Sequence, residues 1–296
     1  MSKHIIKLMR PQQWLKNTFV FMPLFFGRHA TEWSYVWPCL LACLAFCLAA
    51  SGVYCLNDVC DAEADRQHPV KCSRPVASGA VSRRMAYAMM AVMWMTSLAL
   101  VGLGCLYSDV IGKGLSATLL LYIAMNVAYC VWLKQIALLD VFIISTGFVL
   151  RIVAGGLATG ITLSHWIVLI TFLLALFLAL AKRRDDVVIY ETSGIKARKS
   201  VERYNMDFLR SAIGVLASVI IMCYMLYTVS DDVTERIGNH YLYATSFFVL
   251  AGILRYMQLT LVDQQSGSPT KALLHDHFIQ ACVGGWIATF AVILYL

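Results

Sequence analysis

The feature that most limits how this chain can fold is a series of apolar runs, each about 20 residues long, that recur along nearly its whole length. One of them, YVWPCLLACLAFCLAASGVYCL at residues 35–56, carries no charged side chain. A helix of about 20 apolar residues crosses the roughly 30 Å hydrocarbon core of a bilayer. Only 14% of the residues are charged and 60% are hydrophobic, whereas about a quarter of a soluble domain is charged. The sequence therefore predicts an all-α polytopic membrane protein.

The apolar runs predict nine transmembrane helices in a single membrane domain, residues 1–296. The first of these spans is short, and the expected bounds are 14–27, 34–56, 84–107, 111–133, 138–158, 164–182, 208–230, 240–262 and 276–296. The basic N-terminal residues are not followed by the small-residue cleavage site of a signal peptide. No stretch has the composition of a separate soluble domain or of a low-complexity linker.

The basic residues predict the orientation of these spans. Twenty of the 24 Lys and Arg residues fall on one side of the membrane under this topology, three fall on the other, and Arg151 lies within a span. Loops rich in Lys and Arg remain in the cytoplasm. The N-terminus and the polar motifs described below are therefore expected to be cytoplasmic. The net charge of +7 follows from these loops, and without a basic stripe on a soluble domain nucleic-acid binding is not expected.

A polar motif, NDVCDAEAD, directly follows the second predicted span. Asn57 and Asp58 stand at the membrane boundary, and Asp58, Asp61 and Asp65 have the i, i+3, i+7 spacing that places side chains on one face of a helix. Carboxylates stacked in this way repel one another unless a cation lies between them. Oxygen ligands without thiols or imidazoles suit Mg²⁺, which also bridges to phosphate oxygens. The motif is therefore a candidate magnesium and diphosphate site.

Basic residues stand close to this motif and in a second cluster. Lys71 and Arg74 follow in KCSRP and are placed to neutralise phosphate oxygens. The second cluster, AKRRDDVVIYE, follows the sixth predicted span, and its candidate site residues are Lys182, Arg183, Arg184 and Asp186. A mixture of donors and metal-capable acceptors favours a phosphorylated sugar with a metal over a simple membrane anchor.

Three further cations are candidates for binding an anionic lipid head. Lys16 lies in MRPQQWLKN at the mouth of the first span, where the spacing alone does not separate a membrane anchor from a binding residue. Lys134 lies in the loop before the fifth span, and Arg151 lies within that span. A charged residue inside a span normally faces a cavity or a partner and is a functional candidate by default.

Together these residues resemble the UbiA-type membrane prenyltransferase superfamily, whose N-D-x-x-D-x-x-x-D signature is intact in Asn57, Asp58, Asp61 and Asp65. The chain is most similar to the polyprenyl-phosphate phosphoribosyltransferase branch. The stretches that carry this resemblance are RPQQWLKN, DAEADRQHPVKCSRPVASG, LLDVFIISTGFVLRIVAGG, KRRDD and GSPTKALLHD. The second D-x-x-x-D motif of the aromatic prenyltransferases is missing, because Tyr190 stands four residues after Asp186.

The resemblance implies a UbiA-like helical bundle around a cytoplasm-facing cavity in the inner membrane of a bacterium. It implies transfer of 5-phosphoribose from phosphoribosyl pyrophosphate to a polyprenyl phosphate, a step in the synthesis of cell-envelope glycan precursors. The three aspartates would be catalytic and hold Mg²⁺ on the diphosphate. For this reaction our candidates for the ribose 5-phosphate are Lys182, Arg183, Arg184 and Asp186, and our candidates for the lipid phosphate are Lys16, Lys134 and Arg151. The motifs do not decide which of the two phosphates each basic group binds.

Two other functions remain open at this point. A UbiA-type aromatic prenyltransferase would use the same aspartates to bind a polyprenyl diphosphate, although the missing second motif is against it. A lipid-binding or transport protein is a more remote alternative, because the polar motifs cluster in loops and no internal repeat is visible. Neither the length of the lipid nor the formation of a homo-oligomer follows from these motifs.

Overall fold

The computed structural model describes residues 2–67, 71–105, 109–194, 199–263 and 269–295. All of the candidate site residues lie in these ranges, whereas Gly267 and Ser268 of GSPTKALLHD lie outside them. The described residues form helices and connecting turns, without a strand, as an all-α protein requires. The chain divides into two compact units, Met1–Leu163 and Ser164–Leu296.

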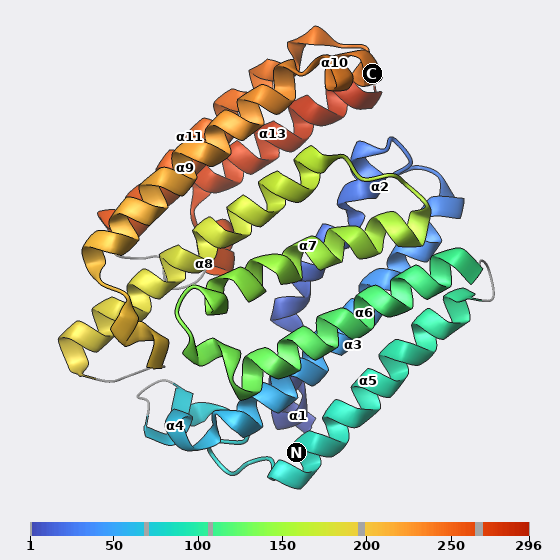
Figure 1. Cartoon of the computed structure of the whole chain (residues 1–296). Coiled ribbons are helices and arrows are strands. Elements are labelled where there is room, and N and C mark those ends of the chain that lie inside the picture. Colours follow the sequence, from blue (N-terminus) through green and yellow to red (C-terminus); the bar gives the residue numbers. More distant parts are fainter. Residues whose placement is uncertain (1, 68–70, 106–108, 195–198, 264–268, 296) are drawn as a thin grey trace. The chain divides into compact units, whose positions relative to one another are not determined.

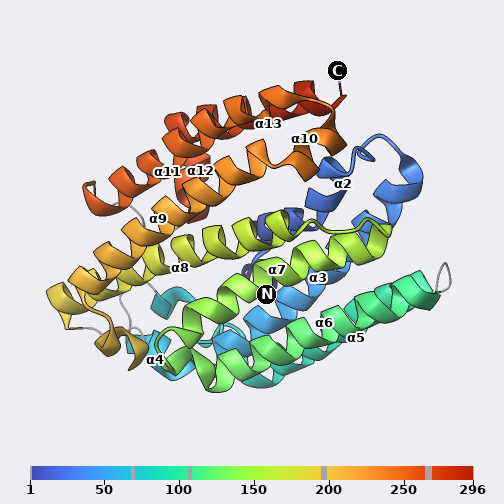
Figure 2. The ribbon, with the colours of Figure 1, turned by 45° about the horizontal axis from the view of Figure 1, so that its top comes forward.

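The first unit is built on four long helices with a short N-terminal helix and 3₁₀ segments (blue to green in Figure 1; turned in Figure 2). Its elements are α1 (Ser2–Met9), the 3₁₀ helix η1 (Pro11–Phe21), α2 (Met22–Phe26), α3 (Trp33–Cys60), α4 (Ala62–Gln67), η2 (Lys71–Ser73), α5 (Arg83–Cys105), α6 (Asp109–Val131), η3 (Leu133–Gln135) and α7 (Leu139–Thr159).

The second unit contains the remaining helices (yellow to red in Figure 1). They are α8 (His165–Ser193), η4 (Lys199–Arg203), α9 (Met206–Val229), α10 (Asp231–Ile237), η5 (His240–Thr245), α11 (Ser246–Leu261), α12 (Pro269–His275) and α13 (His277–Tyr295). Asp276 accepts a hydrogen bond from the Ile279 amide at 2.8 Å and so caps α13. A further hydrogen bond from Arg255 holds the pKa of the Asp276 carboxyl below its usual range.

Eight helices of the described residues are long and apolar enough to cross a membrane. They correspond to the second through ninth predicted spans, so the multi-pass membrane protein is confirmed. The first predicted span, 14–27, instead forms η1 followed by the five-residue α2. The full count of nine spans therefore stays a prediction.

The N-terminal segment nevertheless follows α3 along most of its length. Arg10 contacts Asp58 near the C-terminal end of α3, and Asn17 contacts Cys47 in its middle. The His29 ring stacks on Tyr35 near the N-terminal end, with ring centroids 4.0 Å apart. Since residues 35–58 of a helix rise about 35 Å, the segment runs antiparallel to α3 over a distance comparable to the thickness of a bilayer.

Small side chains allow η1 to lie between α3 and α7. On the α3 side, the Cys39 thiol donates to the Val20 carbonyl oxygen at 3.3 Å, and Cys43 donates to the Asn17 carbonyl at 3.5 Å. On the α7 side, a Cβ on Gly155 would lie 1.9 Å from the Val20 carbonyl oxygen. The position therefore requires glycine because the two backbones are already in contact.

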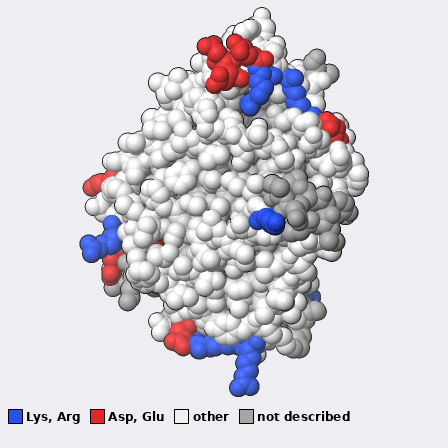
Figure 3. Space-filling model, turned by 45° about the vertical axis from the view of Figure 1, so that its right-hand side comes forward, with Lys and Arg blue, Asp and Glu red and all other residues white. Residues whose placement is uncertain are grey.

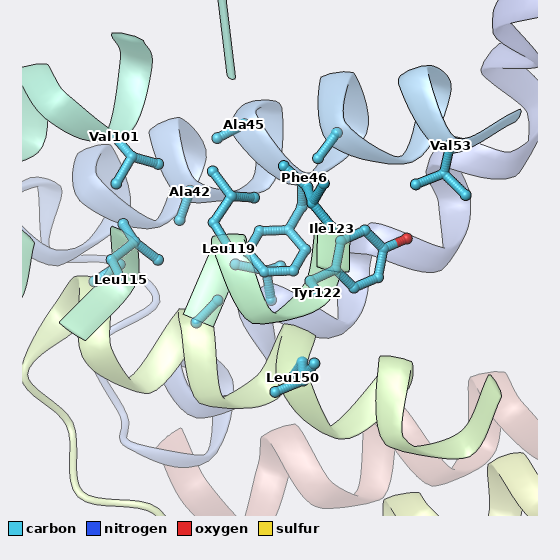
Figure 4. Close-up of a cluster of buried hydrophobic side chains, with 14 of the residues drawn as sticks. Ala42, Ala45, Phe46, Val53, Val101, Leu115, Leu119, Tyr122, Ile123 and Leu150 are labelled. Atoms are coloured by element: carbon cyan, nitrogen blue, oxygen red, sulfur yellow. The ribbon is translucent and has the colours of Figure 1, made fainter. Parts of the chain in front are cut away.

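Apolar side chains fill the interior of the first unit. Figure 4 shows Phe46 of α3 packed among Leu119, Tyr122 and Ile123 of α6, with Leu150 of α7 on the other side. On the face shown in Figure 3, uncharged residues cover most of the surface. A largely uncharged surface is what helices exposed to lipid require.

Candidate functional site

The aspartate motif lies where α3 gives way to α4. The long helix ends at Cys60, Asp61 is its C-cap, and α4 begins at Ala62. Helical hydrogen bonds continue through the junction, from the Asp61 amide to Asn57 and from the Asp65 amide to Asp61. The assigned α-helix is interrupted at Asp61, but these hydrogen bonds keep the backbone helical across the junction. Asp58 and Asp65 are buried, whereas Asp61 is half-buried.

Arg10 provides the nearest cation to Asp58. Its Nη2 donates to Asp58 Oδ1, and its guanidinium lies over the Tyr54 ring, 4.9 Å from the centroid. Arg10 itself has a positive φ of 52°, an uncommon conformation that ends α1 and turns the chain into η1. Arg10 is therefore held in place by both its backbone and the ring below it.

Two further cations approach the motif from other parts of the first unit. Arg74 Nη1 lies 2.5 Å from Asp65 Oδ2 and 3.8 Å from Asp58 Oδ1, so one guanidinium serves both carboxylates. Lys134, which is buried in η3, donates to Asp61 Oδ1 at 2.5 Å. The repulsion expected among the aspartates is therefore offset by cations that come from three separate segments.

The carboxylates of the aspartate motif provide some, but not all, of the ligands that a hard divalent cation needs. Asp58 Oδ2 is buried and accepts no hydrogen bond from the described residues, which leaves one carboxylate oxygen open. No three His, Cys, Asp or Glu side chains in the described ranges converge on a common point. Mg²⁺ commonly uses one or two carboxylates and completes its coordination with water and substrate phosphates. The motif fits that mode, with Asp58 as the open ligand.

Arg151 lies deeper in the first unit, on α7, with only 7% of its surface exposed. It donates from Nε to Asn17 Oδ1 at 2.6 Å, from Nη1 to the Gly147 carbonyl at 2.6 Å and from Nη2 to the Tyr122 hydroxyl at 2.9 Å. The rings of Tyr122 and Phe148 lie 4.9 and 5.3 Å from the guanidinium carbon. The residue is fixed by neutral groups from η1, α6 and α7.

The remaining candidates of the first unit lie near these groups. Lys16, on η1, is half-buried and within electrostatic range of Arg151 and Arg10. The Asn57 amide oxygen is 3.7 Å from the Cys130 thiol, at the start of the motif. Lys71 is half-buried in η2, three residues before Arg74.

The second basic cluster belongs to the second unit and lies within a helix. α8 continues to Ser193, so the expected end of the span at residue 182 is not the end of the helix. Arg183 and Arg184 are each only 1% exposed, whereas Lys182 points to the surface. Arg183 pairs with Asp186 one turn later. The cluster is thus a buried polar group with one exposed lysine, rather than a row of surface anchors.

Polar groups of α11 lie close to this cluster. The Tyr256 ring packs on Phe177 of α8, with centroids 5.6 Å apart, and its hydroxyl has Asp185 and Thr260 as polar neighbours. Arg184 Nε and Nη1, the Tyr256 hydroxyl and the Thr260 hydroxyl are buried and make no hydrogen bond to a described residue. Buried polar atoms of this kind are usually satisfied by water or a ligand.

Several residues of these clusters are missing from the sequence-based candidates. Arg10 binds Asp58 and lies over Tyr54, and Asn17 accepts from Arg151. In the second unit, Tyr256 and Thr260 lie close to the α8 cluster. A partial signal existed for Arg10 and Asn17, because both belong to the RPQQWLKN stretch that carries the resemblance. The hydroxyl residues stand in apolar runs and give no signal in sequence.

Comparisons with known proteins add a family and a fold. The UbiA prenyltransferase family matches residues 19–282. A decaprenyl-phosphate phosphoribosyltransferase of Mycolicibacterium smegmatis is 35% identical over 302 residues, covering 98% of this chain and 92% of that protein. The protein of the same name from Corynebacterium glutamicum is also 35% identical, with 99% and 87% covered.

Among solved structures, a UbiA homologue from Archaeoglobus fulgidus bound to GPP and Mg²⁺ is similar in fold. The TM-score is 0.71 at 17% identity, and the match covers 99% of this chain and 100% of that one. At this identity the likeness supports the arrangement of helices and does not extend to the ligand.

Proposed function

The chain belongs to the UbiA prenyltransferase family, and on this premise we propose that it transfers 5-phosphoribose from phosphoribosyl pyrophosphate to a polyprenyl phosphate. The observation that carries the proposal is the 35% identity to decaprenyl-phosphate phosphoribosyltransferases over nearly the full length of both chains. The missing second D-x-x-x-D motif, replaced by KRRDD, supports the same choice over an aromatic prenyltransferase.

The reaction breaks the bond between the anomeric carbon of the ribose and the diphosphate oxygen. A new bond forms from a phosphate oxygen of the lipid to that carbon, and diphosphate leaves. The products are polyprenyl-phosphoryl-5-phosphoribose and diphosphate. Because the lipid phosphate is already ionised at neutral pH, the enzyme needs to stabilise the leaving group more than to remove a proton.

Asp58, Asp61 and Asp65 are assigned to the donor diphosphate. A Mg²⁺ held through Asp58, with water and phosphate oxygens completing its coordination, would neutralise the charge that grows on the departing diphosphate. The basic side chains that now pair with the aspartates, Arg10, Arg74 and Lys134, would then donate to diphosphate oxygens. Lys134 is therefore assigned to the diphosphate rather than to the lipid phosphate, because it contacts Asp61. Lys71, three residues before Arg74, is assigned to the same group.

The ribose 5-phosphate is assigned to the α8 cluster. Arg184 has two buried nitrogen atoms without a hydrogen-bond partner among the described residues, which suits an oxyanion. Arg183, Asp186 and Lys182 belong to the same turn of the helix. We further propose that the protein lies in the inner membrane of a bacterium with its active site open to the cytoplasm, because the donor is water-soluble.

The function is tested with purified protein, labelled phosphoribosyl pyrophosphate and a defined polyprenyl phosphate. We expect label in the lipid extract, a product mass that corresponds to polyprenyl-phosphoryl-phosphoribose, and loss of the reaction in excess EDTA. A product formed only from polyprenyl diphosphate and an aromatic acid would favour the aromatic prenyltransferase. Binding without any product would favour the transport or lipid-binding alternative.

Substitution of Arg10 tests whether the N-terminal segment takes part in the reaction. In Arg10→Gln the nearest remaining cation to Asp58 is Arg74, at 3.8 Å. We expect turnover at saturating substrates to fall at least about tenfold, because a charge-assisted hydrogen bond contributes about 1.5–3 kcal/mol.

The matched control for Arg10 is Arg83→Gln. Arg83 forms an exposed pair with Glu63 at 2.9 Å, and exposed pairs contribute little, so this variant should keep its activity. Wild-type turnover in Arg10→Gln would exclude Arg10 from the site.

A further inference from the structure

Two cations of the first unit lack a countercharge. Within the part of the chain that the structure describes, neither Lys16 nor Arg151 forms an ion pair. Arg151 gives its hydrogen bonds to an amide, a carbonyl and a hydroxyl, all of them neutral. Lys16 directly precedes Asn17, whose side chain accepts from Arg151 at 2.6 Å, and the two like charges are within electrostatic range of each other.

Such an arrangement is costly inside a membrane protein. A buried charge loses its hydration, and a second charge of the same sign adds repulsion. The Tyr122 and Phe148 rings stabilise the Arg151 guanidinium but do not neutralise it. The neutral contacts fix the orientation of the cation while its charge stays available to a ligand. An anion that binds here would supply the missing countercharge.

The position of the pair separates it from the aspartate motif. Asn17, which holds Arg151, also contacts Cys47, and Cys47 is eleven residues before Asp58, or about 16 Å along α3. The anion would therefore lie nearer the middle of α3 than the aspartate motif does. Lys16 is also within electrostatic range of Arg10, the residue that pairs with Asp58. Lys16 is therefore within range of both Arg151 and the cation at the aspartate motif.

We propose that Lys16 and Arg151 form a separate anion site that binds the phosphate monoester head of the acceptor lipid. The assignment of this anion to the acceptor rests on the proposed function. Asn17 and Tyr122 are positioning residues, because they orient the Arg151 guanidinium and make no contact with the ligand in this scheme.

The variant Asn17→Asp gives the sharpest test. Asn17 Oδ1 already accepts from Arg151 Nε at 2.6 Å, so aspartate supplies an internal countercharge with almost no change in shape. We expect affinity for polyprenyl phosphate to fall at least about tenfold, the effect of one lost charge-assisted interaction. The KM for phosphoribosyl pyrophosphate should change by less than about twofold, because the donor site is untouched.

The readout that does not depend on activity is thermal stabilisation of the detergent-solubilised protein. Polyprenyl phosphate should stabilise the wild type, whereas polyprenol of the same length and inorganic phosphate should have little effect. Lys16→Gln provides a second variant, since Lys16 makes no hydrogen bond in the described ranges, and it should lose the same stabilisation. Asn239→Asp is the control: Asn239 caps η5 through the Tyr241 amide, and aspartate also caps helices.

Two results would overturn the inference. Equal affinity of Asn17→Asp and wild type for polyprenyl phosphate would make the Arg151 charge purely structural. Equal stabilisation by inorganic phosphate would assign the site to a free anion instead of a lipid. If the wild type binds polyprenyl phosphate through these residues but forms no phosphoribosyl lipid, the site stands and the proposed function fails.

Discussion

Replacing Asp58 with asparagine is expected to lower the rate of phosphoribosyl transfer by about a hundredfold or more, the usual effect of losing one electrostatic contact to a leaving group. Asp58 is 1% exposed, and its Oδ2 is open while Oδ1 is bound by Arg10. Asparagine keeps the shape but removes the charge that would hold a metal. Initial rates at saturating donor and acceptor measure the effect, and raising the Mg²⁺ concentration should restore part of the activity if metal affinity is reduced.

Glu63→Gln is a closely matched control for Asp58→Asn. Glu63 lies between Asp61 and Asp65 in α4, and its carboxylate is exposed and pairs with Arg83. Since an exposed pair is worth little, this loss of one negative charge in the same segment should leave turnover close to wild type. Equal, small effects in both variants would show that Asp58 has no special part in the reaction and would remove the basis for a metal at this motif.

The sequence predicts the class of the protein and the acidic half of the site because both depend on local patterns. Apolar runs indicate spans by length alone, and the motif Asn57 to Asp65 is contiguous. Arg74 is only nine residues from Asp65, so its role in the motif could be anticipated. These features require no knowledge of how distant segments pack.

The cationic half of the site depends on tertiary packing. Arg10 reaches Asp58 over 48 residues, and Lys134 reaches Asp61 over 73 residues. The contact of Arg10 exists because η1 runs back along α3, and hydropathy does not specify that path. The loop of Lys134 gives no indication that its side chain turns to the motif, so the sequence suggested a lipid phosphate instead.

Hydropathy also does not predict the residue at which a helix ends. The apolar run of α8 stops at residue 181, but Lys182, Arg183 and Arg184 are good helix formers, and Arg183 and Asp186 pair at i, i+3. Hydropathy therefore predicts where the apolar part of α8 ends, but not that the helix continues to Ser193. In the first predicted span, hydropathy likewise does not specify the helix type, because η1 packs against α3 and α7 as a 3₁₀ helix.

Gly155→Ala is expected to disturb the first unit more than any other single methyl group added to it. A Cβ there would lie 1.9 Å from the Val20 carbonyl oxygen and 2.9 Å from its carbon, and these are backbone atoms. To accommodate the methyl group, η1 must move away from α7, which also strains the contact between Asn17 and Arg151. Overpacking of this kind costs about 1–3 kcal/mol or more, so the thermal midpoint in detergent should fall by several degrees and acceptor affinity should fall with it.

Gly102→Ala on α5 is the control, because its Cβ would meet nothing within 4 Å, and alanine favours a helix. If Gly155→Ala and Gly102→Ala have the same thermal midpoint and the same acceptor affinity, then η1 does not pack against α7 as described. The binding role of Arg151 would then lose its structural support, because that role depends on Asn17 of η1.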